Sequence, residues 1–308
     1  PWTLRPPRPY NAHMENAAVQ VRAGMRESGE RPFVKMHGIG NDFVIFDGRQ
    51  DSFAPSPELA RKVADRRFGI GCDQVITLLP ADDADLFMLI QNPDGSESGA
   101  CGNATRCVAS LVMEEAGRSD LVIRTRGGLL ACTRDGDGRI TVDMGAPRLE
   151  WHEIPLAREM DTADIEFEIA TAEGGLLRAP VGVNMGNPHA VFFVADADAV
   201  DVAAIGPRIE HDPLFPERVN VSFAAVMGRE RIRLRVWERG AGITLACGSA
   251  ACATLVAATR RGLVDSAATI VMDGGELQVQ WRESDGHVLM TGPAEEVFRG
   301  SLGLGAGS

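Results

Sequence analysis

Short apolar runs, separated by glycine, asparagine and aspartate, dominate the chain from Phe33 onward. Runs of this length, bounded by turn residues, favour β-strands over long helices. The first half predicts strands at 33–36, 43–47, 75–79 and 86–91, followed by a meander at 121–126, 129–133 and 140–144. The polar segment 37–42 is expected to be a loop between the first two strands.

Helical signals interrupt the strands at four places. Ser56 and Pro57 are typical of an N-cap and a first helical residue, and this helix is expected to end at Gly69. Small or mixed apolar segments predict the other three helices, over 104–116, over 198–209, and from 248 to a stop at Gly262.

The same order of elements occurs again in the second half. Strands are expected at 177–183, 190–194, 219–226 and 232–237, with a closing meander at 268–272, 277–281, 287–290 and 296–298. The repetition predicts an α+β fold of two similar, pseudo-symmetric domains, each a β-rich sheet or barrel around a central helix. We expect the domains at 32–147 and 148–308. Residues 1–31, rich in proline and without an apolar period, are expected to be a disordered leader.

A cysteine stands at the start of each of the two small-residue helices. The segments are Cys101-Gly102-Asn103 and Cys247-Gly248-Ser249. Unpaired N–H groups and the helix dipole lower a thiol pKa at such a position, so a reactive thiolate is expected. Glycine has no side chain, so the backbone can come close to a ligand there. The N–H groups at the two helix starts would bind a carboxylate and stabilise the negative charge of a developing carbanion. Two facing halves would place both thiols at one atom, as proton exchange with inversion requires.

The overall charge argues against several partners. With 31 basic and 43 acidic residues the formal charge is −12, which opposes binding to nucleic acid or an anionic membrane surface and favours a small-molecule ligand. No apolar run approaches the roughly 18–20 residues of a membrane helix, and no secretory signal is visible. Six cysteines without a C-x-x-C spacing predict free thiols in the cytoplasm and no zinc site.

Several motifs carry a family resemblance. They are MHGIGNDFVIFD, GCDQ, NPDGSESGACGN, NMGNPHAVFF, ERVNVSFA and ERGAGITLACGSAACA, and together they resemble diaminopimelate epimerase from about Phe33 to the C-terminus. The resemblance implies an isomerase of lysine and peptidoglycan precursor biosynthesis that interconverts LL- and meso-2,6-diaminopimelate. It implies proton transfer at the α-carbon by a thiolate and a thiol, with neither pyridoxal phosphate nor metal. It also implies a homodimer, a site between the domains, and a last strand, from about 291, that packs back on the first domain.

The resemblance also assigns residues. Cys101 and Cys247 match the catalytic cysteines, and His189 and Glu238 match positions that support catalysis. The substrate-binding positions are Asn41, Gln74, Asn92, Gly102, Asn103, Asn187, Asn220, Glu238, Arg239, Gly248 and Ser249. Amides that donate and accept, with one arginine, suit a substrate that has two ammonium and two carboxylate groups. The departures from the family pattern, which concern helix packing and loops, are Ile243, Ala104, Thr105 and the segment 98–100.

Other readings of the same residues stay open. Cysteine before an alanine-rich helix is usually structural, and Cys72, Cys107, Cys132 and Cys252 are interpreted in this way. One alternative is another enzyme of the same broad fold, either a proline or hydroxyproline racemase or an isomerase that lacks the cysteine pair. The many amides argue against a substrate with only one carboxylate and no second amine. A thiol hydrolase with His189 as base would leave the second cysteine turn without a role. A non-catalytic binder would hold an anion at both helix starts and exchange no proton.

Overall fold

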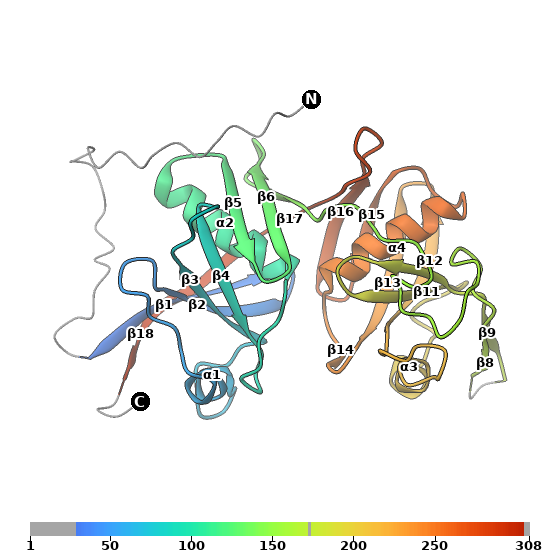
Figure 1. Cartoon of the computed structure of the whole chain (residues 1–308), viewed down its shortest axis with the longest axis horizontal. Coiled ribbons are helices and arrows are strands. Elements are labelled where there is room, and N and C mark those ends of the chain that lie inside the picture. The colour runs from blue at the N-terminus through green and yellow to red at the C-terminus, as the bar shows by residue number, and fades with distance from the viewer. Residues whose placement is uncertain (1–28, 172–173, 305–308) are drawn as a thin grey trace.

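The computed structural model describes residues 29–171 and 174–304. Figure 1 shows two lobes, one coloured blue to green and the other yellow to orange, each with one long helix among its strands. The expected α+β fold of two pseudo-symmetric halves is confirmed. The expected disordered leader lies outside the described residues up to 28. The expectation is wrong for Glu30 and Arg31, which begin strand β1 (Glu30–Gly38) because their backbones pair with Gly303 and Leu302.

The first half forms a sheet whose strands are neighbours in chain order. Its elements are β1 (Glu30–Gly38), β2 (Asn41–Asp47), α1 (Pro57–Ala64), β3 (Gln74–Leu79), β4 (Leu86–Gln91), α2 (Gly102–Ala116), β5 (Asp120–Thr125), β6 (Gly128–Arg134) and β7 (Ile140–Asp143). The pairs β2/β3 and β4/β5 are parallel, and the other neighbours are antiparallel.

The second half repeats this pattern of parallel and antiparallel pairs. Its main elements are β10 (Val181–Asn184), β11 (Pro188–Phe193), α3 (Val202–Glu210), β12 (Asn220–Gly228), β13 (Arg231–Glu238), α4 (Gly248–Arg260), β15 (Ala267–Met272), β16 (Gly275–Trp281) and β17 (Val288–Gly292). Here β11/β12 and β13/β15 are the parallel pairs. The short β14 (Gly242–Ile243) pairs with β13, and β8 (Glu168–Ala170) and β9 (Leu176–Arg178) form a separate small sheet.

One sheet runs through both halves. β7 pairs antiparallel with β17, with Val142 opposite Met290. The last strand, β18 (Glu295–Gly303), pairs antiparallel with β1, so the end of the described chain lies in the sheet of the first half. The two halves are therefore joined by backbone hydrogen bonds as well as by side-chain packing.

Helices α2 and α4 lie in the cores of the two halves. Residues 102–109 of α2 and 250–258 of α4 are buried without interruption. A helix with small and apolar residues on all sides is typical of a buried position. The expected end of α2 at Gly117 is confirmed, since Gly117 has φ +61° and its N–H bonds back to the last turn.

Some expected boundaries were wrong for local reasons. α1 ends at Ala64 rather than at Gly69, because the Asp65 side chain accepts hydrogen bonds from the backbone of residues 67 and 68. The strand expected at 177–183 is split, because Ala179 has φ +52° and Pro180 lacks an N–H. The helix expected from 198 begins at Val202, where Asp201 caps it. The expected loop 37–42 is a hairpin whose turn residues are Ile39 and Gly40.

Candidate active site

The starts of α2 and α4 contact the same side chain. A Cβ atom added at Gly102 would lie 2.7 Å from Met290 Cε, and one added at Gly248 would lie 2.9 Å from Met290 Sδ. Both helix N-termini therefore face Met290 of β17, whose flexible thioether end lies against each glycine. The structure thus brings the two cysteine turns together at the boundary of the halves.

Cys101 lies beside the amides of Asn41 and Asn103. Its Sγ atom is 3.8 Å from Asn41 Oδ1, and Asn103 Nδ2 donates to Asn41 Oδ1 at 3.1 Å. The same Asn103 amide donates to the carbonyl oxygen of Ala246 at 3.3 Å, directly before Cys247. Asn103 therefore links the first cysteine turn to the second.

Cys247 lies beside a hydroxyl and a carboxylate. Its Sγ atom is 3.5 Å from Ser249 Oγ. The carboxylate of Glu238 accepts a hydrogen bond from the Thr244 hydroxyl. Burial raises the pKa of Glu238, and hydrogen bonds from Thr244 and Cys247 oppose that rise.

The expectation of lowered thiol pKa values is wrong in this structure. Burial raises the pKa of Cys101 to about 11, although the N–H groups of the helix start lower it. Burial, followed by the nearby Glu238 charge, raises the pKa of Cys247 well above its usual range. Removal of the thiolate from water therefore outweighs the helix terminus, and both groups are thiols at neutral pH.

Three amide residues of the first half stand at the ends of neighbouring strands. Asn41 begins β2, Gln74 begins β3, and Asn92 follows β4. Gln74 Nε2 donates to Asn92 Oδ1 at 2.9 Å, and Asn41 Nδ2 donates to Asp73 Oδ2 at 2.8 Å. The buried Oε1 of Gln74 has no hydrogen-bond partner among the described residues, so it can accept one from a ligand.

The corresponding strand ends of the second half carry Asn187, His189, Asn220 and Arg239. His189 Nε2 lies 3.0 Å from Asn187 Oδ1, and burial lowers the pKa of His189 to about 3, so the ring is neutral. Asn220 Oδ1 accepts from the backbone N–H of Arg239 at 3.0 Å. The Arg239 side chain is exposed and donates to the carbonyl oxygen of Glu217 at 3.0 Å. Asn187, His189 and Asn220 therefore lie together, whereas the Arg239 guanidinium points to the carbonyl oxygen of Glu217.

Sequence reasoning missed Arg106 of α2. Its guanidinium donates to Asn103 Oδ1 at 2.9 Å, and its side chain is fully buried. A charged residue within a run of small residues was the available signal. The equivalent position of α4, five residues after its cysteine, is Cys252.

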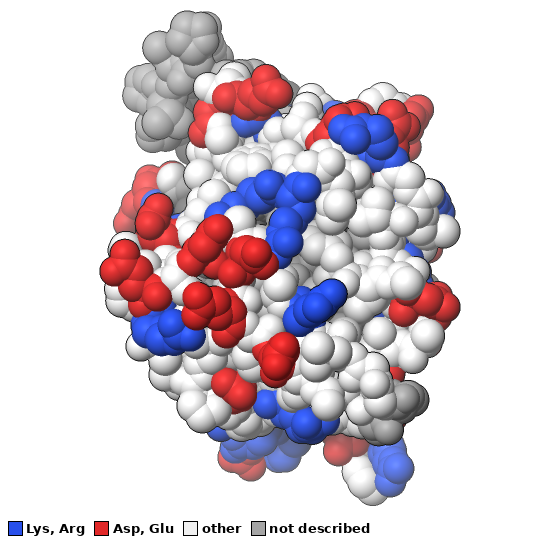
Figure 2. Space-filling model, turned by 90° about the vertical axis from the view of Figure 1, so that its right-hand side faces the viewer, with Lys and Arg blue, Asp and Glu red and all other residues white. Residues whose placement is uncertain are grey.

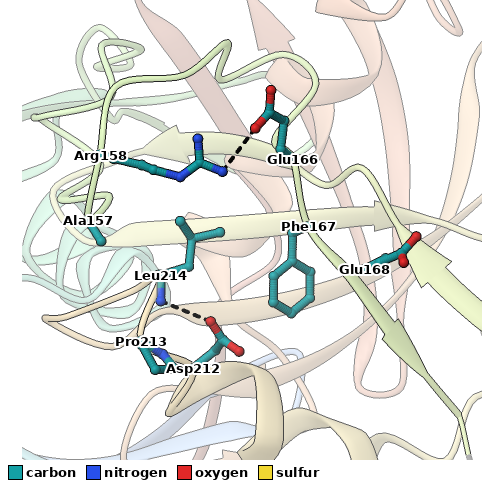
Figure 3. Close-up of a pocket in the computed structure, with 8 residues that line it drawn as sticks. All are labelled: Ala157, Arg158, Glu166, Phe167, Glu168, Asp212, Pro213 and Leu214. Carbon is teal, nitrogen blue, oxygen red and sulfur yellow. Dashed lines mark hydrogen bonds and ion pairs between the residues drawn. The ribbon is translucent and has the colours of Figure 1, made fainter.

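A cavity of about 440 Å³ lies elsewhere in the second half (Figure 3). It is lined by Ala157, Arg158, Glu166, Phe167, Glu168, Asp212, Pro213 and Leu214, and none of these is a predicted site residue. Arg158 and Glu166 form an ion pair of 2.9 Å at its side. This cavity therefore does not define the candidate active site.

Figure 2 shows acidic and basic side chains next to each other at the outer end of the second half, without the continuous basic surface typical of nucleic-acid binding. Within residues 29–171 and 174–304, no group of three His, Cys, Asp or Glu side chains is arranged to hold a metal ion. No helix in the described part of the chain is long and apolar enough to cross a membrane.

Solved structures place the fold in a known class. A hydroxyproline epimerase from Agrobacterium vitis has a TM-score of 0.64 at 16% identity, over 89% of this chain and 91% of that chain. A Bacillus anthracis phenazine biosynthesis protein of the PhzF family has a TM-score of 0.63 at 15% identity, over 89% and 99%. At such low identity the likeness shows the fold alone, that of the two-domain class which includes these proteins.

Sequence relatives define the family within that class. The pattern of the family described as "Diaminopimelate epimerase" matches residues 33–150 and 181–297. Diaminopimelate epimerase of Rhodospirillum centenum is 56% identical over 274 residues, covering 88% of this chain and 92% of the relative. That of Phenylobacterium zucineum is 54% identical over 272 residues, covering 88% and 98%. The chain belongs to the diaminopimelate epimerase family, which confirms the resemblance and the enzyme class, an isomerase.

Proposed function

We propose that this chain interconverts LL- and meso-2,6-diaminopimelate by a two-base exchange between Cys101 and Cys247, without cofactor or metal. The observation that carries the proposal is the approach of the two cysteine turns to Met290 from both halves. The high identity to relatives named diaminopimelate epimerase supports the choice of substrate. This reaction is a step toward lysine and peptidoglycan precursors.

The proton balance of the exchange is simple. One cysteine, as thiolate, removes the α-proton and becomes a thiol, while the other thiol protonates the opposite face and becomes a thiolate. The N–H groups at the starts of α2 and α4 bind the α-carboxylate and stabilise the carbanion. Because burial raises both thiol pKa values, one thiol first has to lose its proton. It releases this proton to water as the positive α-ammonium group of the substrate enters beside it and stabilises the thiolate.

The surrounding polar groups take the rest of the substrate. Asn41, Gln74 and Asn92 of the first half and Asn187 and Asn220 of the second supply amides that donate and accept. The Arg239 guanidinium turns from the Glu217 carbonyl to a substrate carboxylate, which it binds more strongly than a neutral oxygen. His189 orients the Asn187 amide through their hydrogen bond. The negative charge of Glu238 adds to the burial that raises the pKa of Cys247.

A solvent-label experiment tests the two-base exchange. Reduced enzyme is incubated with LL-diaminopimelate in deuterated water. The isomers are then separated, and the mass of each is measured by mass spectrometry. We expect one deuterium at the α-carbon of each meso molecule formed, because the delivered proton comes from a thiol that exchanges with solvent. Inversion without deuterium would rule out this mechanism.

The assembly and location are also proposals. β18 is an edge strand, and Val297 and Phe298 on it are 53% and 46% exposed. Such an edge with apolar side chains suits pairing with a second copy, and we propose a homodimer. The six free cysteines support a reducing cytoplasm.

Light scattering on a sizing column tests the dimer. Val297→Asp should move the molar mass from dimer toward monomer, because a charge would be buried at the interface. The matched control is Leu129→Asp, which changes a leucine that is 48% exposed on β6 and should leave the mass unchanged. A monomeric parent protein would contradict the proposal.

A further inference from the structure

Arg106 is a buried cation without an acidic partner. Its side chain is 0% exposed, and its guanidinium donates to Asn103 Oδ1 and to the carbonyl oxygen of Pro293 at 3.3 Å. Within residues 29–171 and 174–304, no carboxylate forms an ion pair with it. Burial of a charge without a counter-charge destabilises a fold, so stability does not explain this residue.

The guanidinium occupies a slot made by two glycines. A Cβ atom added at Gly38, at the end of β1, would lie 2.9 Å from Arg106 Nη2. One added at Gly292, at the end of β17, would lie 3.1 Å from Arg106 Nε. Nη1 lies 3.6 Å from Met290 Sδ. The side chain is thus enclosed at the junction of the two halves, directly behind the first cysteine turn.

From Arg106 a chain of hydrogen bonds runs to Asp73. Arg106 donates to Asn103 Oδ1 (2.9 Å), Asn103 Nδ2 donates to Asn41 Oδ1 (3.1 Å), and Asn41 Nδ2 donates to Asp73 Oδ2 (2.8 Å). A guanidinium can only donate, and an ionised carboxylate can only accept. With a donor at one end of this chain and an acceptor at the other, each amide satisfies its hydrogen bonds in the chain in one orientation only. In that orientation Asn41 Oδ1 faces Cys101.

We propose that Arg106 is a positioning residue: by donating to Asn103, its guanidinium fixes which ends of the Asn103 and Asn41 amides face Cys101 and the substrate. A neutral residue at this place would leave Asn103 Oδ1 without its charged donor, so the Asn103 amide, and through it the Asn41 amide, would be held less firmly in this orientation. The substrate would then meet donors and acceptors in mixed orientations. The proposal rests on the proposed function, in which both amides bind diaminopimelate.

Arg106→Lys and Arg106→Met separate orientation from packing. Lysine keeps a donor-only group, whereas methionine fills the slot without one and removes the cost of a buried charge. We expect Arg106→Met to raise KM for diaminopimelate by about tenfold or more, with a smaller change in kcat, and Arg106→Lys to stay within about threefold of the parent. The melting temperature of the methionine variant should equal or exceed that of the lysine variant.

A purely structural role predicts a different result. KM would then follow the melting temperature, and the methionine variant would bind substrate at least as well as the lysine variant, which would overturn the proposal. An equal rise of KM in both variants would also overturn it. Arg106→Leu, which also lacks a donor and therefore has the same expectations, serves if the methionine variant does not fold.

The matched control is Arg260→Met in α4. Arg260 is half-buried and donates to the carbonyl oxygen of Gly182 at 3.1 Å and to Thr162 Oγ1 at 2.9 Å. This change should lower the melting temperature and leave KM unchanged. A similar KM rise in the control would mean that loss of any buried arginine disturbs the site, and would overturn the specific role of Arg106.

A second measurement does not depend on catalysis. In protein labelled with ¹⁵N at asparagine side chains, the Asn103 amide protons should exchange slowly with D₂O in the parent and in Arg106→Lys. Exchange should be about tenfold faster or more in Arg106→Met, because the amide is no longer held. Unchanged exchange overturns the proposal. If the parent fails to epimerise diaminopimelate while the exchange result holds, only the proposed function fails.

Discussion

The two cysteine turns have the same backbone and different electrostatic surroundings. Both cysteines are extended N-cap residues without a side-chain cap bond. Burial is the main cause of the raised pKa of both thiols. At Cys101 the N–H groups of the helix start and the charge of Arg106 oppose burial while Glu238 adds to it, whereas at Cys247 Glu238 is the largest cause after burial. A duplicated backbone alone would give two equal thiols. The side chains around it make the two thiols electrostatically unequal.

The hairpin turns near the two sites differ in a similar way. Ile39 and Gly40, between β1 and β2, pack against the second half, and Ile39 is part of the hydrophobic core around α4. The corresponding Gly186, between β10 and β11, is exposed, and a Cβ added there would meet open space. The first half thus inserts into the second, without an equivalent contact in the other direction at this turn.

Removal of either thiol should have the largest effect. We expect Cys101→Ala and Cys247→Ala each to lower kcat by about 10²–10⁴-fold, because each removes one of the two proposed proton-transfer groups. The measurement is epimerisation of both isomers, with circular dichroism to show that the fold is kept. Cys132→Ala, a change at a buried cysteine of β6, should keep its activity. Full activity in either of the first two variants would remove that cysteine from the mechanism.

Equivalent glycines in the two meander hairpins should differ in their importance for stability. A Cβ at Gly274 would overlap the carbonyl oxygen of Ile39, which is fixed in the hairpin turn. One at Gly127 would lie 3.0 Å from the carbonyl oxygen of Gly99, in an exposed loop that can shift. We expect Gly274→Ala to lower the free energy of unfolding by about 3 kcal/mol and Gly127→Ala by about 1 kcal/mol.

Urea denaturation followed by fluorescence measures both values. Equal losses would mean that the halves contact each other less tightly at Ile39 than the packing indicates.

The pH dependence of alkylation should show the raised pKa of Cys101. For a thiol pKa of about 11, the thiolate fraction at pH 8 is about one in a thousand and rises tenfold for each pH unit up to the pKa. Iodoacetamide should therefore modify Cys101, in Cys247→Ala protein, without a plateau below pH 10. A plateau below pH 8 would contradict a raised pKa.

Loss of the Glu238 charge should sharpen this difference. Glu238→Gln removes the negative charge that raises the pKa of Cys247, so Cys247 in Cys101→Ala protein should alkylate about tenfold faster at pH 8.5. Cys101 in Cys247→Ala protein should gain less, because Glu238 is a weaker cause of its pKa rise. Equal gains at both cysteines would mean that the carboxylate does not distinguish them.

The sequence by itself determined most of the local structure and the family. Alternating short apolar runs and turn residues indicated nearly every strand, and the repeated order of elements predicted the two halves. Gly117 marked the end of α2, and the glycine after each cysteine marked the helix starts. These features depend on neighbours in the chain, so the sequence contains the information. The boundaries at Ala64 and Ala179 needed the local hydrogen bonds and dihedral angles of the structure.

Only the tertiary structure decided the electrostatics of the site. The helix-start argument gave the wrong direction for the thiol pKa values, because burial depends on residues far away in the sequence. The meeting of both turns at Met290 likewise requires the pairing of β7 with β17. In the sequence Arg106 is an ordinary helix residue, and only the folded structure shows that it is enclosed between Gly38 and Gly292. Desolvation and enclosure are collective properties of packing, and a linear pattern does not contain them.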